Sequence, residues 1–228
     1  MPDSPAIELR AVARRFGERT ALRDVSVLVP RGATLAVLGR NGAGKSTLLR
    51  ILATLLRPHG GDVRVLGEPL PRRGFAVRPK VGLLGHEPLL YRDLTGRENL
   101  QYHARLHGLP EDRAERLLGA VGMELRADDS VRSLSRGMIQ RLAVCRAVLH
   151  DPELLLLDEP RANLDPAASE LVEPLIGGGN GRTRVLTSHD PQAAIDEADL
   201  VLGLRDGKPA FLAKPDELNP GQVKELYA

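Results

Sequence analysis

Hydrophobic positions along the chain change their spacing twice. Short runs rich in Val, Leu and Ala predict strands at 6–12, 25–29, 34–38, 61–66 and 80–85. The stretch STLLRILATLL predicts a helix that begins near Gly44 and ends before Pro58. From about 87 to 150 the apolar residues recur at helical spacing, which predicts helices over 96–109, 110–123 and 135–149.

After Pro152 the chain returns to strands. LLLLD at 154–158 is a continuous apolar run, typical of a parallel strand that is buried on both faces, and RTRVLTS at 182–188 is similar. The segment 199–212 predicts two strands joined by an Asp-Gly turn. The order of elements predicts an α/β protein with a parallel central sheet and a helical insertion.

Composition and charge narrow the class of protein. The chain of 228 residues is long enough for one good core, and 42% hydrophobic with 27% charged residues excludes general disorder. A net charge of +2 without a basic cluster leads us to expect no nucleic-acid partner. The single cysteine, Cys145, excludes an internal disulfide, and the N-terminus has no secretory pattern, so we expect a cytoplasmic protein. No apolar run approaches the ~20 residues that span a bilayer.

A glycine-rich loop lies between a predicted strand and a predicted helix. GRNGAGKST at 39–47 fits the phosphate-loop pattern, in which Lys45 meets the β and γ oxygens and Ser46 offers its hydroxyl to Mg²⁺. Phe16 either stacks on the adenine or belongs to the core. The predicted ATP-binding residues are Phe16, Gly39, Arg40, Asn41, Gly42, Ala43, Gly44, Lys45, Ser46 and Thr47.

Two carboxylates end the buried strand at 154–158, and burying them is costly unless they have a role. Asp158 is placed to reach Mg²⁺ through water, and Glu159 is placed to accept a proton from water that attacks the γ-phosphate. His189 follows the next strand and should emerge at the same edge of the sheet, although a lone histidine is often structural. We predict Glu159, His189 and Lys45 as the catalytic residues.

A second anion site is predicted far from the phosphate loop. LSRGMIQRL at 134–142 places a serine and a glycine at the start of an amphipathic helix, where backbone amides point at an anion. Taken alone, the stretch also fits a capped surface helix.

The motifs GRNGAGKST, LSRGMIQRL, LLLLDEP, NLDP and TSHD, in this order, resemble those of the nucleotide-binding subunit of an ATP-binding cassette (ABC) transporter. The resemblance covers nearly the whole chain. It implies ATP and Mg²⁺ as cofactors, ATP hydrolysis coupled to transport, and a homodimer in which the signature loop of one subunit caps the ATP of the other. It implies contacts to the partner's ATP from Ser135, Arg136, Gly137, Met138, Asn163 and Asp165.

The same resemblance implies a P-loop NTPase fold that has an antiparallel β subdomain besides the parallel central sheet. The whole chain, 1–228, is then one ATPase domain with a core of 1–86 and 151–228 and a helical subdomain at about 87–150. Integral membrane transporter subunits are the implied partners, at the inner face of the cell membrane. The segment around 95–109 is the expected docking surface, and His103 and His107 are expected on a solvated helix face rather than on a metal.

Two motifs depart from the family pattern, the signature and the stretch around His86. The signature is usually LSGGQ, and here Arg136 and Met138 replace Gly and Gln. A glutamine that touches Mg²⁺ and water is replaced by His86, for which we predict a place at the metal with Ser46 and Asp158. A neutral imidazole can accept from a metal-bound water, and it titrates near neutral pH. The alternative is that His86 packs at the junction with the helical lobe.

The stretches GHEP and SRGM resemble the heme exporter ATPase of cytochrome c maturation, in which heme would be handled by partners. The alternative is a multidrug, lipid or polysaccharide exporter. A DNA-repair ATPase would need a long coiled coil between the phosphate loop and the signature, and a kinase or GTPase would leave the signature unexplained.

Overall fold

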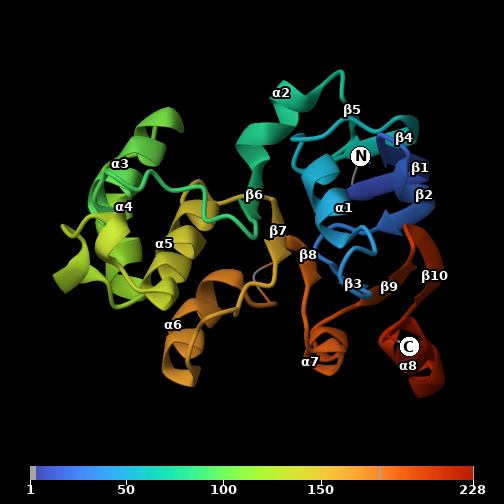
Figure 1. Cartoon of the computed structure of the whole chain (residues 1–228). Helices are drawn as coiled ribbons and strands as arrows, with labels where there is room; N and C mark the ends of the chain where they lie inside the picture. Colours follow the sequence, from blue (N-terminus) through green and yellow to red (C-terminus); the bar gives the residue numbers. More distant parts are fainter. Residues whose placement is uncertain (1–3, 180, 228) are drawn as a thin grey trace.

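The structure is a computed structural model that describes residues 4–179 and 181–227 (Figure 1). One of its two sheets is antiparallel, with strand order β2-β1-β4-β5. Its strands are β1 (Ile7–Phe16), β2 (Arg19–Val29), β4 (Gly60–Val65) and β5 (Glu68–Leu70). β1 and β2 form a long hairpin, so the strands predicted at 6–12 and 25–29 were too short. The missed parts of the hairpin, 13–16 and 19–24, contain polar residues that interrupt the apolar run on which the prediction rested, and register shifts break the alternation of buried and exposed positions in β1.

The second sheet has six strands in the order β10-β9-β3-β8-β7-β6. All neighbours are parallel except β9 and β10. The strands are β3 (Thr34–Leu38), β6 (Val81–Leu84), β7 (Leu154–Asp158), β8 (Thr183–Thr187), β9 (Leu200–Arg205) and β10 (Lys208–Ala213). The parallel central sheet and the antiparallel sheet are both confirmed, as is the Asp206-Gly207 turn between the last two strands.

The α-helices are α1 (Lys45–Leu52), α2 (Gly74–Val77), α3 (Gly96–Leu106), α4 (Asp112–Ala120), α5 (Arg136–Val148), α6 (Pro166–Ile176), α7 (Pro191–Asp196) and α8 (Pro220–Tyr227). Short 3₁₀ turns lie at Arg78–Lys80, Glu124–Arg126, Val131–Ser133 and Pro215–Glu217. Helix α1 is shorter than predicted, because Thr54 adopts a left-handed φ of 64° and stops it. No helix of the described residues is long and apolar enough to cross a membrane.

Helices α3, α4 and α5 group on one side of the molecule, at the left in Figure 1. All three lie within 87–150, the segment predicted as a helical subdomain. Helix α3 begins with a capping box, in which the Thr95 hydroxyl accepts from the amide of Glu98 while the Glu98 carboxylate accepts from the amide of Thr95. Helix α5 begins at the Ser135 cap described below.

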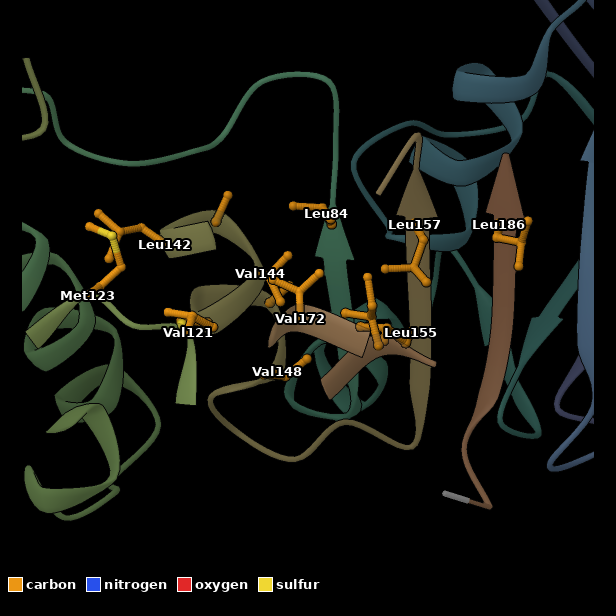
Figure 2. Close-up of a cluster of buried hydrophobic side chains, with 14 of the residues drawn as sticks. Leu84, Val121, Met123, Leu142, Val144, Val148, Leu155, Leu157, Val172 and Leu186 are labelled. Atoms are coloured by element: carbon orange, nitrogen blue, oxygen red, sulfur yellow. The ribbon is translucent and has the colours of Figure 1, made fainter. Parts of the chain in front are cut away.

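The helical group is joined to the central sheet by one continuous hydrophobic cluster (Figure 2). Leu155 and Leu157 of β7 point into it, together with Val144 of α5 and Val172 of α6. The alternate residues of β7 belong to a second cluster, which fills the space between α1, the antiparallel sheet and the other face of the central sheet. The helix that carries the signature therefore shares one hydrophobic core with β7, the strand that ends in Asp158.

The histidines of the helical group differ in their exposure. His107 is exposed, and its ring stacks on that of the partly buried His150 with centroids 4.2 Å apart. His103 is partly buried, and this burial, together with the nearby Arg146 and His107, lowers the pKa of His103 to about 4. The expectation that His103 lies on a solvated face was therefore wrong, because α3 turns this side chain toward Arg146 of α5 rather than to solvent.

Candidate active site

The phosphate loop follows β3 without interruption and ends where α1 begins at Lys45. Its glycines are required by contacts as well as by φ: a Cβ at Gly39 would lie 2.3 Å from the Leu204 carbonyl oxygen, and one at Gly44 would lie 2.5 Å from that of Ala21. Gly44 is also the N-cap of α1 and supplies no side-chain acceptor. The first amides of α1 are therefore free to bind an anion.

Lys45 extends back over its own loop. Its Nζ donates to the carbonyl oxygens of Gly39 at 2.6 Å and Arg40 at 3.1 Å. Burial lowers the pKa of Lys45 overall, although the negative charges of Glu159 and Asp158 partly offset this effect. The ammonium group is thus held between the loop and the two carboxylates, where it can meet the outer phosphates of a nucleotide.

The two carboxylates are fixed by the neighbouring strand. The Thr187 hydroxyl donates to Asp158 Oδ1 at 2.7 Å and accepts from the amide of Glu159 at 3.2 Å. Glu159 has a left-handed φ of 54°, which turns the chain sharply at the end of β7. Thr187 was not predicted as a site residue, because a threonine within a strand carries no distinguishing spacing.

The three predicted catalytic residues line one cavity of about 390 Å³. Lys45, Glu159 and His189 meet there because β3, β7 and β8 are parallel and end at the same edge of the sheet. Tyr227 of α8 also lines this cavity and accepts a hydrogen bond from the Gly39 amide at 3.2 Å. Its place was not predicted, since it lies 188 residues from the loop it touches.

Phe16 is the last residue of β1, next to the turn of the β1–β2 hairpin, and it lies beside the phosphate loop. It lines a cavity of about 270 Å³ with Gly44, Lys45, Ser46 and other loop residues. The side chain is 45% exposed, so the alternative that Phe16 belongs to the core is not what the structure shows. Arg19, from the other strand of the hairpin, lines the same cavity and was not predicted. An exposed ring and a guanidinium group suit a base and a ribose-phosphate.

The residues predicted to bind Mg²⁺ also come together. Ser46, Asp158 and His86 line a single pocket between α1 and the end of β6. A hydroxyl and a carboxylate are the hard oxygen donors that Mg²⁺ prefers, while the imidazole of His86 suits contact through water better than direct ligation. Among the described residues, no group of three or more His, Cys, Asp or Glu side chains could hold a metal ion. These donors fit Mg²⁺ that keeps phosphate and water oxygens as most of its ligands.

The signature loop contacts the loop that follows β7. Ser135 caps α5 by accepting from the Met138 amide at 3.3 Å. A Cβ on Gly137 would lie 3.0 Å from the Asn163 carbonyl oxygen, so the two loops touch. Arg136 is exposed, and Met138 is half-buried against the hydrophobic cluster. Asp165 caps α6 by accepting from the Ala168 amide at 2.8 Å.

These predicted cross-subunit residues lie apart from the chain's own phosphate loop. At least four cavities of the described residues border that loop, and these four are lined by no residue of 134–142 and by neither Asn163 nor Asp165. The structure thus brings the predicted residues together in two groups. One surrounds Lys45, and the other surrounds Ser135.

Known proteins share both the sequence and the fold. The ABC transporter family model matches residues 22–162. The chain is 36% identical, over 95% of its length and 69% of the relative's, to the Nod factor export ATP-binding protein I of Cupriavidus pinatubonensis. It is 38% identical, over 93% of its length and 69% of the relative's, to a daunorubicin resistance ATP-binding protein of Streptomyces coeruleorubidus.

Solved structures of ABC transporter subunits have the same fold as this chain. A structure described as the ATP-binding subunit of an ABC transporter superposes with a TM-score of 0.85 at 28% identity, covering 97% of this chain and 98% of that one. A bacterial ABC transporter cassette solved as a dimer gives a TM-score of 0.82 at 27% identity, covering 92% and 98%. The chain belongs to the ABC transporter family. It is an ATP-binding subunit of an ABC transporter, and its activity is ATP hydrolysis.

Proposed function

We propose that two copies of this chain close head to tail over two ATP molecules. The observation that carries the proposal is that Gly137 lies against Asn163, while neither Ser135 nor Gly137 lines the cavities that Lys45 lines. A second copy related by a two-fold axis would place its signature loop opposite this phosphate loop. A bacterial cassette of the same fold was solved as a dimer, which supports this arrangement.

Within each shared site, the residues divide the chemistry of hydrolysis. The phosphate-loop amides and Lys45 hold the β- and γ-phosphates, and Glu159 accepts the proton of the attacking water. His189, which lines the same cavity as Lys45 and Glu159, would contact the γ-phosphate. Ser135 and Gly137 of the partner subunit complete the cradle from the other side. Mg²⁺ held by Ser46, Asp158 and, through water, His86 would neutralise the charge of the phosphates.

The ATP-dependent closure would drive a separate membrane subunit from the inner face of the membrane. The apolar side of the pocket that also contains Ser46 and Asp158 suits this contact, since Leu55, Leu56 and Leu89 line it together with His86. The exposed Tyr91 and Tyr102 pack edge to face nearby, at the start of the helical group. A partner bound here would contact His86, which lines the same pocket as Ser46 and Asp158 of the nucleotide site.

We infer that the partner is an exporter. Nod factor export and daunorubicin resistance are the roles named for the two relatives described above, and both support outward movement of a small molecule. A phosphonates import ATP-binding protein of Anaeromyxobacter dehalogenans is also 35% identical, although this chain covers only 48% of it. The cargo is set by the membrane partner rather than by the cassette.

Heme export in cytochrome c maturation is the second candidate. It rests on two sequence features, His86 within GHEP and the Arg136 and Met138 of the signature. None of the relatives described above is named for heme, so this narrower function stays a prediction.

One experiment separates the two candidates. The Glu159→Gln variant would be tagged in its native cells and purified in mild detergent with Mg-ATP, and the membrane proteins that accompany it would be identified while the heme absorbance is recorded. We expect a permease without a heme band. Cytochrome-maturation subunits with a heme band would instead establish heme export, and purification without any membrane protein would contradict the transporter partnership.

A further inference from the structure

Arg161 lies in the middle of the loop between the catalytic carboxylate and the predicted dimer seam. It is two residues after Glu159 and two before Asn163. The loop is tightly turned on both sides of it: the Ala162 amide donates to the Glu159 carbonyl at 3.0 Å, and the Leu164 amide donates to the Arg161 carbonyl at 3.3 Å. Arg161 therefore lies within two successive turns that link Glu159 to Leu164.

The guanidinium group of Arg161 joins two helices that are remote in sequence. Nη1 lies 2.6 Å from Glu197 Oε1, at the end of α7, and Nη2 lies 2.6 Å from Glu173 Oε2 on α6. Burial lowers the pKa of Arg161, but the hydrogen bonds to Glu197 and Glu173 outweigh it and raise the pKa overall. Such a two-carboxylate clamp uses the fork geometry of arginine, which lysine does not have.

Glu197 continues this network into the central sheet. Its other oxygen, Oε2, accepts from Arg184 Nη1 at 3.2 Å. Arg184 is only 3% exposed and also donates to the Thr34 hydroxyl and to the Ile176 carbonyl. Glu197 is thus a fixed point, and Arg161 is the group that attaches the loop to it.

The same loop is tied to the signature helix and borders the catalytic cavity. Gln140 of α5 donates to the Pro160 carbonyl at 3.0 Å. Glu159, Arg161, His189 and Glu197 line one further cavity of about 240 Å³, so the clamp forms a wall beside the catalytic groups. Helix α7 begins two residues after His189, with Asp190 as its N-cap.

We propose that Arg161 is a positioning residue that couples closure of the dimer seam to placement of His189 and Glu159. The proposal rests on the head-to-tail dimer proposed above. When the partner presses on Asn163 and Asp165, the loop cannot shift alone, because Arg161 holds it to α7 and α6. Contact of the partner with Asn163 and Asp165 is therefore coupled to the alignment of Glu159 and His189.

The test uses Arg161→Met, which keeps much of the side-chain length and removes the charge. Glu197 remains paired with Arg184 in this variant, and Glu173 is half-exposed, so neither carboxylate is left buried and unpaired. We expect kcat for ATP hydrolysis to fall at least about tenfold while ATP affinity of the monomer stays within about twofold. In the Glu159→Gln background, the same substitution should weaken ATP-dependent dimerisation by at least about tenfold. Arg161→Lys should restore part of kcat and part of the ATP-dependent dimerisation.

A matched control is Arg182→Met, which breaks the ion pair with Asp151 at the opposite end of β8. It should leave kcat and dimerisation unchanged. The positioning role is overturned if Glu159→Gln with Arg161→Met dimerises as tightly as Glu159→Gln alone, or if Arg161→Met keeps the wild-type kcat. Absence of a dimer in Glu159→Gln itself would instead contradict the proposed function, so the two failures are distinguishable.

Discussion

The hydroxyl of Thr187 donates a hydrogen bond to the carboxylate of Asp158 at 2.7 Å, across the boundary between β8 and β7. Thr187 is fully buried, and its hydroxyl also accepts from the amide of Glu159. The Thr187 side chain therefore orients the carboxylate of Asp158, which is predicted at Mg²⁺, and holds the backbone amide of the catalytic Glu159. The arrangement of the site depends on strand pairing in the central sheet and not only on the sequence around Glu159.

Replacing Thr187 with valine keeps the shape of the side chain and removes both hydrogen bonds. We expect kcat to fall by roughly tenfold with ATP affinity unchanged, and the free energy of unfolding to fall by about 1 kcal/mol. Steady-state kinetics and urea unfolding would measure the two effects. Thr183→Val is the control, because Thr183 is a buried threonine of the same strand that accepts from Gly32 at the far end. Equal losses of kcat in both variants would contradict the orienting role of Thr187.

Lys45→Ala removes the ammonium group held between the phosphate loop and the two carboxylates. We expect nucleotide binding to weaken by about 2 to 3 kcal/mol, roughly 100-fold, because the phosphates lose a charged donor and the nearby charges of Asp158 and Glu159 are no longer offset by Lys45. Equilibrium titration with a fluorescent ATP analogue would show this directly. Unchanged binding, or full ATPase activity, would show that the nucleotide lies elsewhere.

Glu159→Gln removes the proton acceptor and keeps the shape of the side chain, and glutamine keeps a similar backbone preference at this left-handed position. We expect the variant to accumulate as an ATP-bound dimer, since phosphate binding is retained while hydrolysis stops. Size-exclusion chromatography with light scattering, with and without Mg-ATP, would detect it. A variant that stays monomeric at saturating Mg-ATP would refute either the role of Glu159 or the dimer.

The histidines beside α5 make stability depend on pH. Burial and the positive neighbours His107, Arg146 and Arg113 lower the pKa of His150 to about 4. In the unfolded chain a histidine titrates near 6.5, so the unfolded state binds more protons between about pH 6.5 and 4, and stability is lost as the pH falls through that window. We expect His150→Gln to lose on the order of 1 kcal/mol less stability than the wild type between about pH 7 and pH 4.5. Urea unfolding at both pH values would test this, and identical losses would contradict it.

The sequence predicted the parts of the fold whose pattern is local. LLLLD is apolar on both faces, so β7 was predicted at its observed bounds, Leu154–Asp158. The ends of β3, β7 and β8 meet because the strands are parallel, which is why the order of strands and motifs was enough to place Lys45, Glu159 and His189 together. The hairpin of β1 and β2 was predicted too short, because polar residues at 13–16 and 19–24 and register shifts in the pairing interrupt the apolar pattern there.

The remaining site residues depend on contacts between distant segments. Tyr227 reaches Gly39 from the last helix, and Arg19 reaches the phosphate loop from the β1–β2 hairpin. No spacing within the chain marks either residue. Arg161 is similar: its position is plain in the sequence, but its two carboxylate partners lie 12 and 36 residues away on separate helices.

The central claim, that each ATP site is built from two copies of the chain, is tested most directly by mixing two inactive variants. Lys45→Ala disables the phosphate loop, and Ser135→Asp keeps a helix cap while placing a negative charge against the partner's γ-phosphate. A mixed dimer has one site with both defects and one intact site. We predict that equal mixing restores up to about one quarter of wild-type ATPase activity, because half of the randomly formed dimers are mixed and each holds one intact site. Activity no higher than that of either variant alone would contradict a shared site.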